Sequence, residues 1–139
     1  MQTIVRDERA RILRFDRGED LLVTLQAFCE KEEIVAGTIS AIGAAEKIVL
    51  SWYDLIEKKY VDVERDEQLE IVALNGNVSS FKGKPIIHAH GCFSDRTMTV
   101  IAGHVKSLIV GATCELRLNI LRGKMERGHD AAVGLHLLQ

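Results

Sequence analysis

Proline is almost absent from this 139-residue chain, and it has no long uncharged apolar run. A single proline and a charged fraction of 27% argue against collagen-like repeats and against a disordered or low-complexity chain. Without a run of about 18 uncharged apolar residues, no membrane-spanning helix and no membrane partner are expected. The opening residues MQTIVRDERARILRF alternate charges where a secretory signal peptide needs an apolar stretch, so we expect a cytoplasmic protein.

Cysteine is also scarce. The three cysteines, Cys29, Cys92 and Cys114, are odd in number and far apart, which favours reduced thiols over a disulfide framework. No CxxC zinc pattern is present.

An excess of positive charge is lacking as well. The formal net charge is −2, so the molecule as a whole does not attract a polyanion. Five arginines fall between Arg6 and Arg17, but acidic residues alternate with them, and this mixture predicts a solvated surface rather than a nucleic-acid patch.

The apolar pattern predicts one sheet-dominated domain over residues 1–139 that carries one principal helix. The helix is expected from Leu21 to about Glu33, with Asp20 as its N-cap. The charged stretch 57–68 is expected to be a hairpin tip or an excursion at the surface, and to carry no chemistry. Alternating or β-branched segments predict strands at 10–16, 34–45, 48–55, 60–63, 70–78, 86–93, 98–105, 113–121 and 131–139.

The most informative segment contains His88 and His90, which lie two residues apart on a predicted strand and therefore share a face. A hairpin centred on Arg96 sets His104 directly across from His88. The three imidazoles then converge, and three histidines with an open fourth position are typical of a zinc site that can hold water or substrate. A slip of one residue would turn His104 to the other face and dismantle the cluster.

Other interpretations stay open for the polar residues. The histidine pair could instead be half-buried rings bonded to backbone carbonyls. Cys92 shares the face of His90, but a small apolar filler suits it better than a sulfur ligand. His129 and His136 lack a histidine partner at useful spacing and are expected at the surface or in the core. Glu70 is the candidate catalytic carboxylate; a metal-bound water, an imidazole or a neighbouring subunit could partner it, or it could lie exposed.

Several segments resemble the plants-and-prokaryotes-conserved (PPC) domain family. They are RGED at 17–20, ISAIGA at 39–44, LEIVALNGN at 69–77, HAH at 88–90 and GHV at 103–105. The resemblance implies an α+β fold with a strongly bent, mostly antiparallel sheet. It also implies a homotrimer and a metal site at His88, His90 and His104, holding zinc or another divalent transition metal. The family is also similar in architecture to zinc-dependent acetolactate decarboxylases, although a shared fold does not transfer chemistry.

Two functions are compatible with this sequence. The first is a trimeric regulatory or interaction module that holds a metal and weakly contacts DNA or a regulatory protein. Plant members of the family carry AT-hook motifs, whereas this chain has no Arg-Gly-Arg-Pro element. The second is a zinc-dependent lyase or hydrolase acting on a small acidic metabolite, with Glu70 as proton carrier. A concave pocket with a cation beside the metal favours the enzyme, and a closed site or a broad basic trimer face favours the module.

Overall fold

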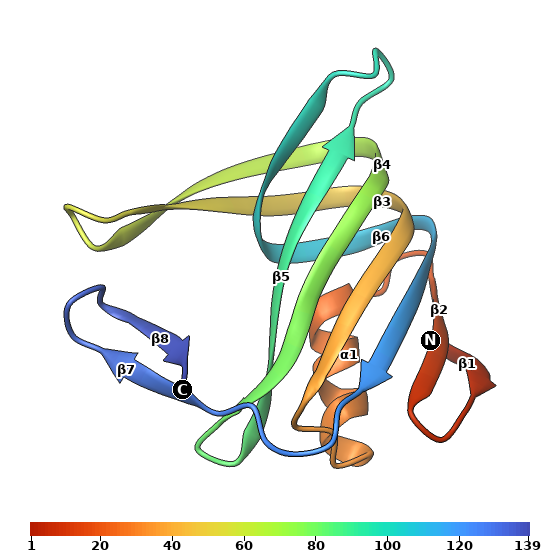
Figure 1. Cartoon of the computed structure of the whole chain (residues 1–139). Coiled ribbons are helices and arrows are strands. Elements are labelled where there is room, and N and C mark those ends of the chain that lie inside the picture. The colour runs from red at the N-terminus through yellow and green to blue at the C-terminus, as the bar shows by residue number, and fades with distance from the viewer.

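The computed structural model describes residues 1–139 as one helix packed against a strongly bent antiparallel sheet (Figure 1), which confirms the expected α+β class. None of its helices combines the length and apolarity that a membrane span requires. The elements in chain order are β1 (Gln2–Arg6), β2 (Ala10–Asp16), α1 (Leu21–Lys31), β3 (Gly37–Asp54), β4 (Lys59–Phe81), β5 (Lys84–Ser94), β6 (Val100–Ile120), β7 (Arg127–Asp130) and β8 (Leu135–Leu138).

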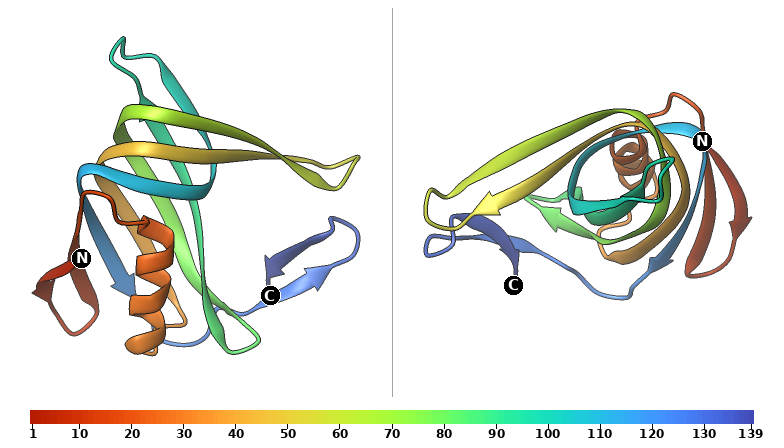
Figure 2. Two further views of the ribbon diagram at one scale, coloured as in Figure 1. Left: turned by 180° about the vertical axis from the view of Figure 1, so that it is seen from behind. Right: turned by 90° about the horizontal axis from the view of Figure 1, so that it is seen from above.

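Helix α1 begins where the sequence predicts it. The Asp20 carboxylate accepts hydrogen bonds from the backbone N–H groups of Leu22 and Val23, at 3.0 and 3.1 Å, and caps the first turn. The apolar stripe of α1 is buried against the sheet, mainly against β5 and β6. Seen from above, the sheet curls around this helix (Figure 2), so one face of the sheet forms the core and the other faces outward.

The main sheet has the strand order β1-β2-β6-β3-β4-β5, and β6 also pairs with β5. Its central strands are longer than expected, because three pairs of predicted strands are each one continuous strand. The fused pairs are 34–45 with 48–55 in β3, 60–63 with 70–78 in β4, and 98–105 with 113–121 in β6. In β4 the charged residues that suggested a break lie in the solvent-exposed half of the strand, where the backbone pairing to β3 continues.

Gly43 bends β3 at the point where the sheet turns over. Its φ is +146°, and a Cβ there would lie 2.2 Å from the carbonyl oxygen of Thr113 on β6. The register of β3 shifts beside Gly43 against both β4 and β6. The backbones of β3 and β6 therefore approach each other closely at this glycine.

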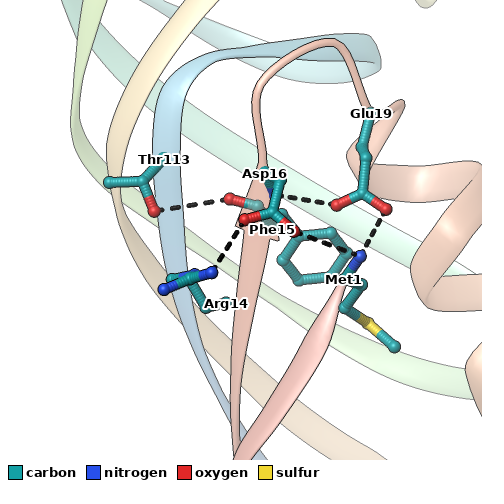
Figure 3. A network of polar contacts seen from close by, with 6 residues as sticks. All are labelled: Met1, Arg14, Phe15, Asp16, Glu19 and Thr113. Carbon is teal, nitrogen blue, oxygen red and sulfur yellow. Dashed lines mark hydrogen bonds and ion pairs between the residues drawn. The ribbon is translucent and has the colours of Figure 1, made fainter.

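The first strand, β1, was not expected, and polar contacts hold it beside the turn between β2 and α1 (Figure 3). The amino group of Met1 lies 2.5 Å from Glu19 Oε1 and 3.8 Å from Asp16 Oδ2. The other oxygen of Glu19 accepts the backbone N–H of Asp16 at 2.7 Å. Thr113 donates its hydroxyl to the carbonyl of Phe15 at 3.3 Å, which fastens the same turn to β6.

The C-terminal residues form a separate two-stranded hairpin, β7–β8. The strand expected over 131–139 is present at Leu135–Leu138, where it pairs with β7 instead of extending the main sheet. The base of this C-terminal hairpin is fixed to β4, because Ser80 donates its backbone N–H to the carbonyl of Met125 at 2.7 Å.

Candidate metal centre

Three histidines lie on the outward face of the sheet, away from α1. Ala89 is buried in the core, so strand alternation places His88 and His90 on the opposite side of β5. Val105 is buried on β6, and its neighbour His104 therefore also faces outward. His88 and His104 are partly buried, whereas His90 is exposed.

The pairing of β5 with β6 corrects one expectation from the sequence. His104 lies opposite His90, not opposite His88, and the hairpin is centred on Thr97 rather than Arg96. The expected register was therefore wrong by two residues. Because side chains alternate with a period of two, a shift of two leaves all three histidines on the same face, and the cluster forms as predicted.

The turn chemistry explains the shift. Asp95 accepts hydrogen bonds from the backbone N–H groups of Thr97 and Thr99, at 2.7 and 3.1 Å, and Met98 adopts a φ of +65°. This wider loop extends the turn beyond the Asp95–Thr97 tip that the sequence suggested.

The ring nitrogens of the three histidines all lie within 4.8 Å of one another. Ring centroids are 5.2 Å apart for His88 and His90, 5.1 Å for His88 and His104, and 5.4 Å for His90 and His104. Tetrahedral zinc at about 2.0 to 2.1 Å from each nitrogen needs those nitrogens about 3.3 Å apart. Small side-chain rotations close that difference, so the donor set and its spacing fit a divalent transition metal.

The surroundings of His88 and His104 favour their neutral forms. Burial lowers the pKa of His88 to about 4, and the positive charge of Arg127 and the neighbouring rings of His104 and His90 act in the same direction. Burial also lowers the pKa of His104, with His90 and Arg127 adding to the effect and the Asp62 carboxylate opposing it. A neutral imidazole is the form that donates its lone pair to a metal.

The hairpin of β3 and β4 contributes to the surroundings of the cluster. Tyr60 stacks on His104, with ring centroids 5.4 Å apart and planes inclined by 26°. Asp62 is in contact with the amine of Lys106, close to His104. Both Tyr60 and Asp62 belong to the stretch 57–68, which was expected to carry no chemistry, and both lie beside the cluster.

Arg127, on β7, is a further neighbour of the cluster that the sequence did not reveal. Its Nη2 lies 3.2 Å from Nδ1 of His88 and 3.0 Å from Oδ1 of Asn77. Its Nε donates to Ser79 Oγ at 2.7 Å, and its Nη1 donates to the carbonyl of His136 at 2.9 Å. Every acceptor is neutral, and Arg127 takes part in none of the ion pairs of the structure.

A cavity of about 360 Å³ lies between the histidine cluster and the C-terminal hairpin. His88, His104, Arg127 and Tyr60 give it polar groups. The C-terminal hairpin is held in place beside the cavity, because the Tyr53 hydroxyl and the Lys58 amine each donate to one carbonyl of its turn at 2.9 Å. The apolar lining comes from Phe81, Ile86, Ile87, Leu135 and Leu137.

Glu70 and Cys92 lie outside the cluster. Glu70 is exposed on β4, where it pairs with Ser94, five residues along the strand from Asn75, the partner of His90. Five residues of strand span about 17 Å, so Glu70 does not reach the histidines of its own chain. Cys92 is half-buried and lines, with His90, a second hollow of about 390 Å³.

His129 and His136 are directly opposed on the C-terminal hairpin. Their ring centroids are 5.4 Å apart, and His136 also packs edge-on against Phe81 at 4.4 Å. The expectation that neither had a histidine partner was therefore wrong, because the hairpin turn that pairs them was not foreseen.

The comparisons with known proteins extend this description. None of the curated proteins compared with the chain matches it. A metal-containing protein from Archaeoglobus fulgidus is 36% identical, with a TM-score of 0.89 over 100% of this chain and 99% of that one. A candidate DNA-binding protein from Bacteroides thetaiotaomicron is 26% identical, with a TM-score of 0.94 over 97% of this chain and 94% of that one.

The fold is also similar to that of α-acetolactate decarboxylase from Bacillus subtilis, as expected. That protein is 13% identical, with a TM-score of 0.57 over 88% of this chain and 57% of its own, and the likeness concerns the fold alone. The family model of the Plants and Prokaryotes Conserved domain matches residues 2–121, a segment that includes all three histidines. The chain therefore belongs to the Plants and Prokaryotes Conserved domain family.

Proposed function

We propose that this protein is a metal-binding module in which His88, His90 and His104 hold one divalent transition-metal ion, with zinc as first choice. The convergence of their ring nitrogens within 4.8 Å carries the proposal. Imidazole nitrogens suit zinc, copper, iron and nickel, and three such ligands leave a coordination position for water or a ligand. The metal-containing relative from A. fulgidus supports this assignment. We place the protein in the cytoplasm, where its three free cysteines stay reduced.

Elemental analysis of the purified protein tests this proposal. We expect about one divalent ion per chain in the wild type and loss of most of it in His88→Ala and in His104→Ala, because two neutral nitrogens hold a zinc ion far more weakly than three. The matched control is His129→Ala, which removes an exposed histidine outside the cluster and should leave the metal content unchanged. Wild-type metal content in both cluster variants would refute the site.

A homotrimer is part of the same proposal. Leu50 is buried on the core face of β3, and Trp52 continues that face beyond the core with Val61 and Val63 on the paired strand. Trp52, Val61 and Val63 are 66%, 46% and 46% exposed, respectively. An apolar surface of this kind is typical of contacts between protein chains.

Contact with DNA or with a regulatory protein completes this interpretation. The candidate DNA-binding relative from B. thetaiotaomicron supports it. The net charge of −2 and the pairing of the N-terminal arginines weaken the electrostatic attraction that dominates DNA affinity, so we expect DNA contact at low salt only. The paired arginines are Arg6 with Glu32, Arg14 with Asp16, and Arg17 with Glu46.

A zinc-dependent lyase or hydrolase is the second candidate function, and one observation favours it. His88 and His104 border a concave cavity in which the cation of Arg127 lies beside His88. A bound metal supplies Lewis acidity in such a place, and Arg127 can orient a small acidic metabolite. Glu70 could carry a proton there only if a neighbouring subunit brought it to the site, since its own chain holds it too far along β4.

A further inference from the structure

We infer that Arg127 and the cavity beside the histidines form a binding site for the carboxylate of a small organic acid. The inference rests on the proposed metal site and specifies the class of ligand that this site accepts. It is carried by the unpaired charge of Arg127, by its contact with His88 and by the apolar walls of the cavity.

Arg127 is a partly buried cation without an acidic partner. Its four hydrogen-bond contacts go to an amide oxygen, a hydroxyl, a backbone carbonyl and an imidazole nitrogen, all neutral. The Asp62 carboxylate, the acidic group that acts on His104, is already occupied by Lys106 and by the hydroxyl of Ser51. A positive charge held in place by neutral groups favours the entry of an anion.

Metal binding at the histidines makes an anion beside Arg127 still more favourable. A guanidinium can only donate, so Nδ1 of His88 must be the acceptor in its contact with Arg127. A neutral imidazole has a single acceptor nitrogen, and a metal ion takes that lone pair while the other nitrogen keeps its proton. Metal ligation by His88 therefore ends the hydrogen bond to Arg127. The released Nη2 then lies close to a second cation that is surrounded by neutral ligands, and an anion between the two relieves their repulsion.

The cavity favours an organic acid over an inorganic anion. The planar fork of a guanidinium matches the two oxygens of a carboxylate. Phe81, Ile87, Leu135 and Leu137 line the cavity with apolar surface, which a hydrocarbon portion covers and a phosphate ion leaves exposed. Arg127 and the two leucines lie beyond residues 2–121, so the C-terminal hairpin, outside the matched domain, supplies the cation and part of the apolar wall.

The test uses cobalt-loaded protein and pentanoate as the probe. We expect pentanoate to change the visible spectrum of bound cobalt in a saturable way, and Arg127→Gln to weaken its binding at least about tenfold, because a charge-assisted contact is lost. Arg127→Lys keeps a point charge without the fork and should be intermediate. The matched control is Arg122→Gln, an exposed arginine 4.0 Å from Glu8, which should bind pentanoate as the wild type does. Cobalt itself should bind Arg127→Gln at least as tightly as it binds the wild type, because a competing donor is gone.

Equal pentanoate affinity in the wild type and Arg127→Gln overturns the inference, and so does phosphate binding tighter than pentanoate. Failure of the wild type to bind cobalt overturns the proposed metal site instead, and the two failures are thus distinguishable. If Arg127→Gln does not fold, Arg127→Lys decides: weaker pentanoate binding supports the inference and wild-type affinity overturns it.

Discussion

Protonation of His88 links the stability of the fold to pH. The pKa of this residue is about 4 in the folded protein, against an ordinary value of 6.5. Between these pH values the unfolded chain binds a proton that the folded chain does not, so the free energy of unfolding rises with pH across this window. Stability is therefore lost as the pH falls from about 6.5 to about 4, and the lowered pKa of His104 acts in the same direction.

We accordingly predict that the urea midpoint of the metal-free protein is lower at about pH 4.5 than at about pH 7. His88→Gln should reduce this difference between the two midpoints, because it removes the titrating ring. Equilibrium unfolding followed by circular dichroism measures both midpoints. His129→Gln, at an exposed histidine, should retain the full difference. An identical pH dependence in His88→Gln and the wild type would contradict the assignment to His88.

The residues of the site differ in how far the sequence could predict them. His88 and His90 share a face because of the two-residue period of a strand, which is a local property. The position of His104 depended on a predicted hairpin. Its register was wrong by two residues, but a shift of two leaves His104 on the same face of the sheet, so the cluster was still predicted. Arg127 reaches His88 through the docking of the C-terminal hairpin on β4, a tertiary contact that no local pattern reports.

At the scale of elements, continuity of the strands was the feature that the sequence obscured. β4 carries polar side chains on both faces in its exposed half and a bulge between Ile71 and Ala73. Both features break the alternation that identifies a strand, although the backbone ladder to β3 continues as far as Lys59. Helix α1 was easier to predict from the sequence, because its apolar stripe and its N-cap lie within a dozen residues.

The close pairing of β4 with β5 depends on Gly76. A Cβ at this position would lie 2.1 Å from the carbonyl oxygen of His88 and 2.9 Å from Cα of Ala89. Gly76→Ala therefore forces the two strands apart beneath the histidines. We predict a loss of about 2 kcal/mol or more in the free energy of unfolding, measured in urea, together with weaker metal binding.

Gly103→Ala is the control for Gly76→Ala. Gly103 precedes His104 on β6, but the nearest atom to its Cβ would be the Ser51 carbonyl oxygen at 3.4 Å, an ordinary contact. The free energy of unfolding of Gly103→Ala should stay within about 0.5 kcal/mol of the wild-type value. Similar losses in both variants would show that close backbone approach at Gly76 is not the cause.

At the scale of the whole molecule, β6 connects the core with the site. Its N-terminal end pairs with β5 and brings His104 to His90, while the rest of the strand pairs with β3 and β2. Closure of the sheet and assembly of the histidine cluster thus depend on the same strand. The closed sheet surrounds α1, but the outer half of the β3–β4 hairpin projects beyond it (Figure 1) and leaves its apolar face uncovered.

That uncovered face leads to a prediction about assembly. We expect light scattering to give about three times the 15.5 kDa mass of one chain, and Trp52→Glu to lower that mass, because a carboxylate buried between apolar surfaces is costly. Val23→Glu is the matched control, since Val23 on α1 is also 66% exposed and lies away from the hairpin. A wild-type mass of one chain would refute the trimer. A trimer that persists in Trp52→Glu would show that its interface lies elsewhere, and the apolar face of β3 and β4 would then need another partner.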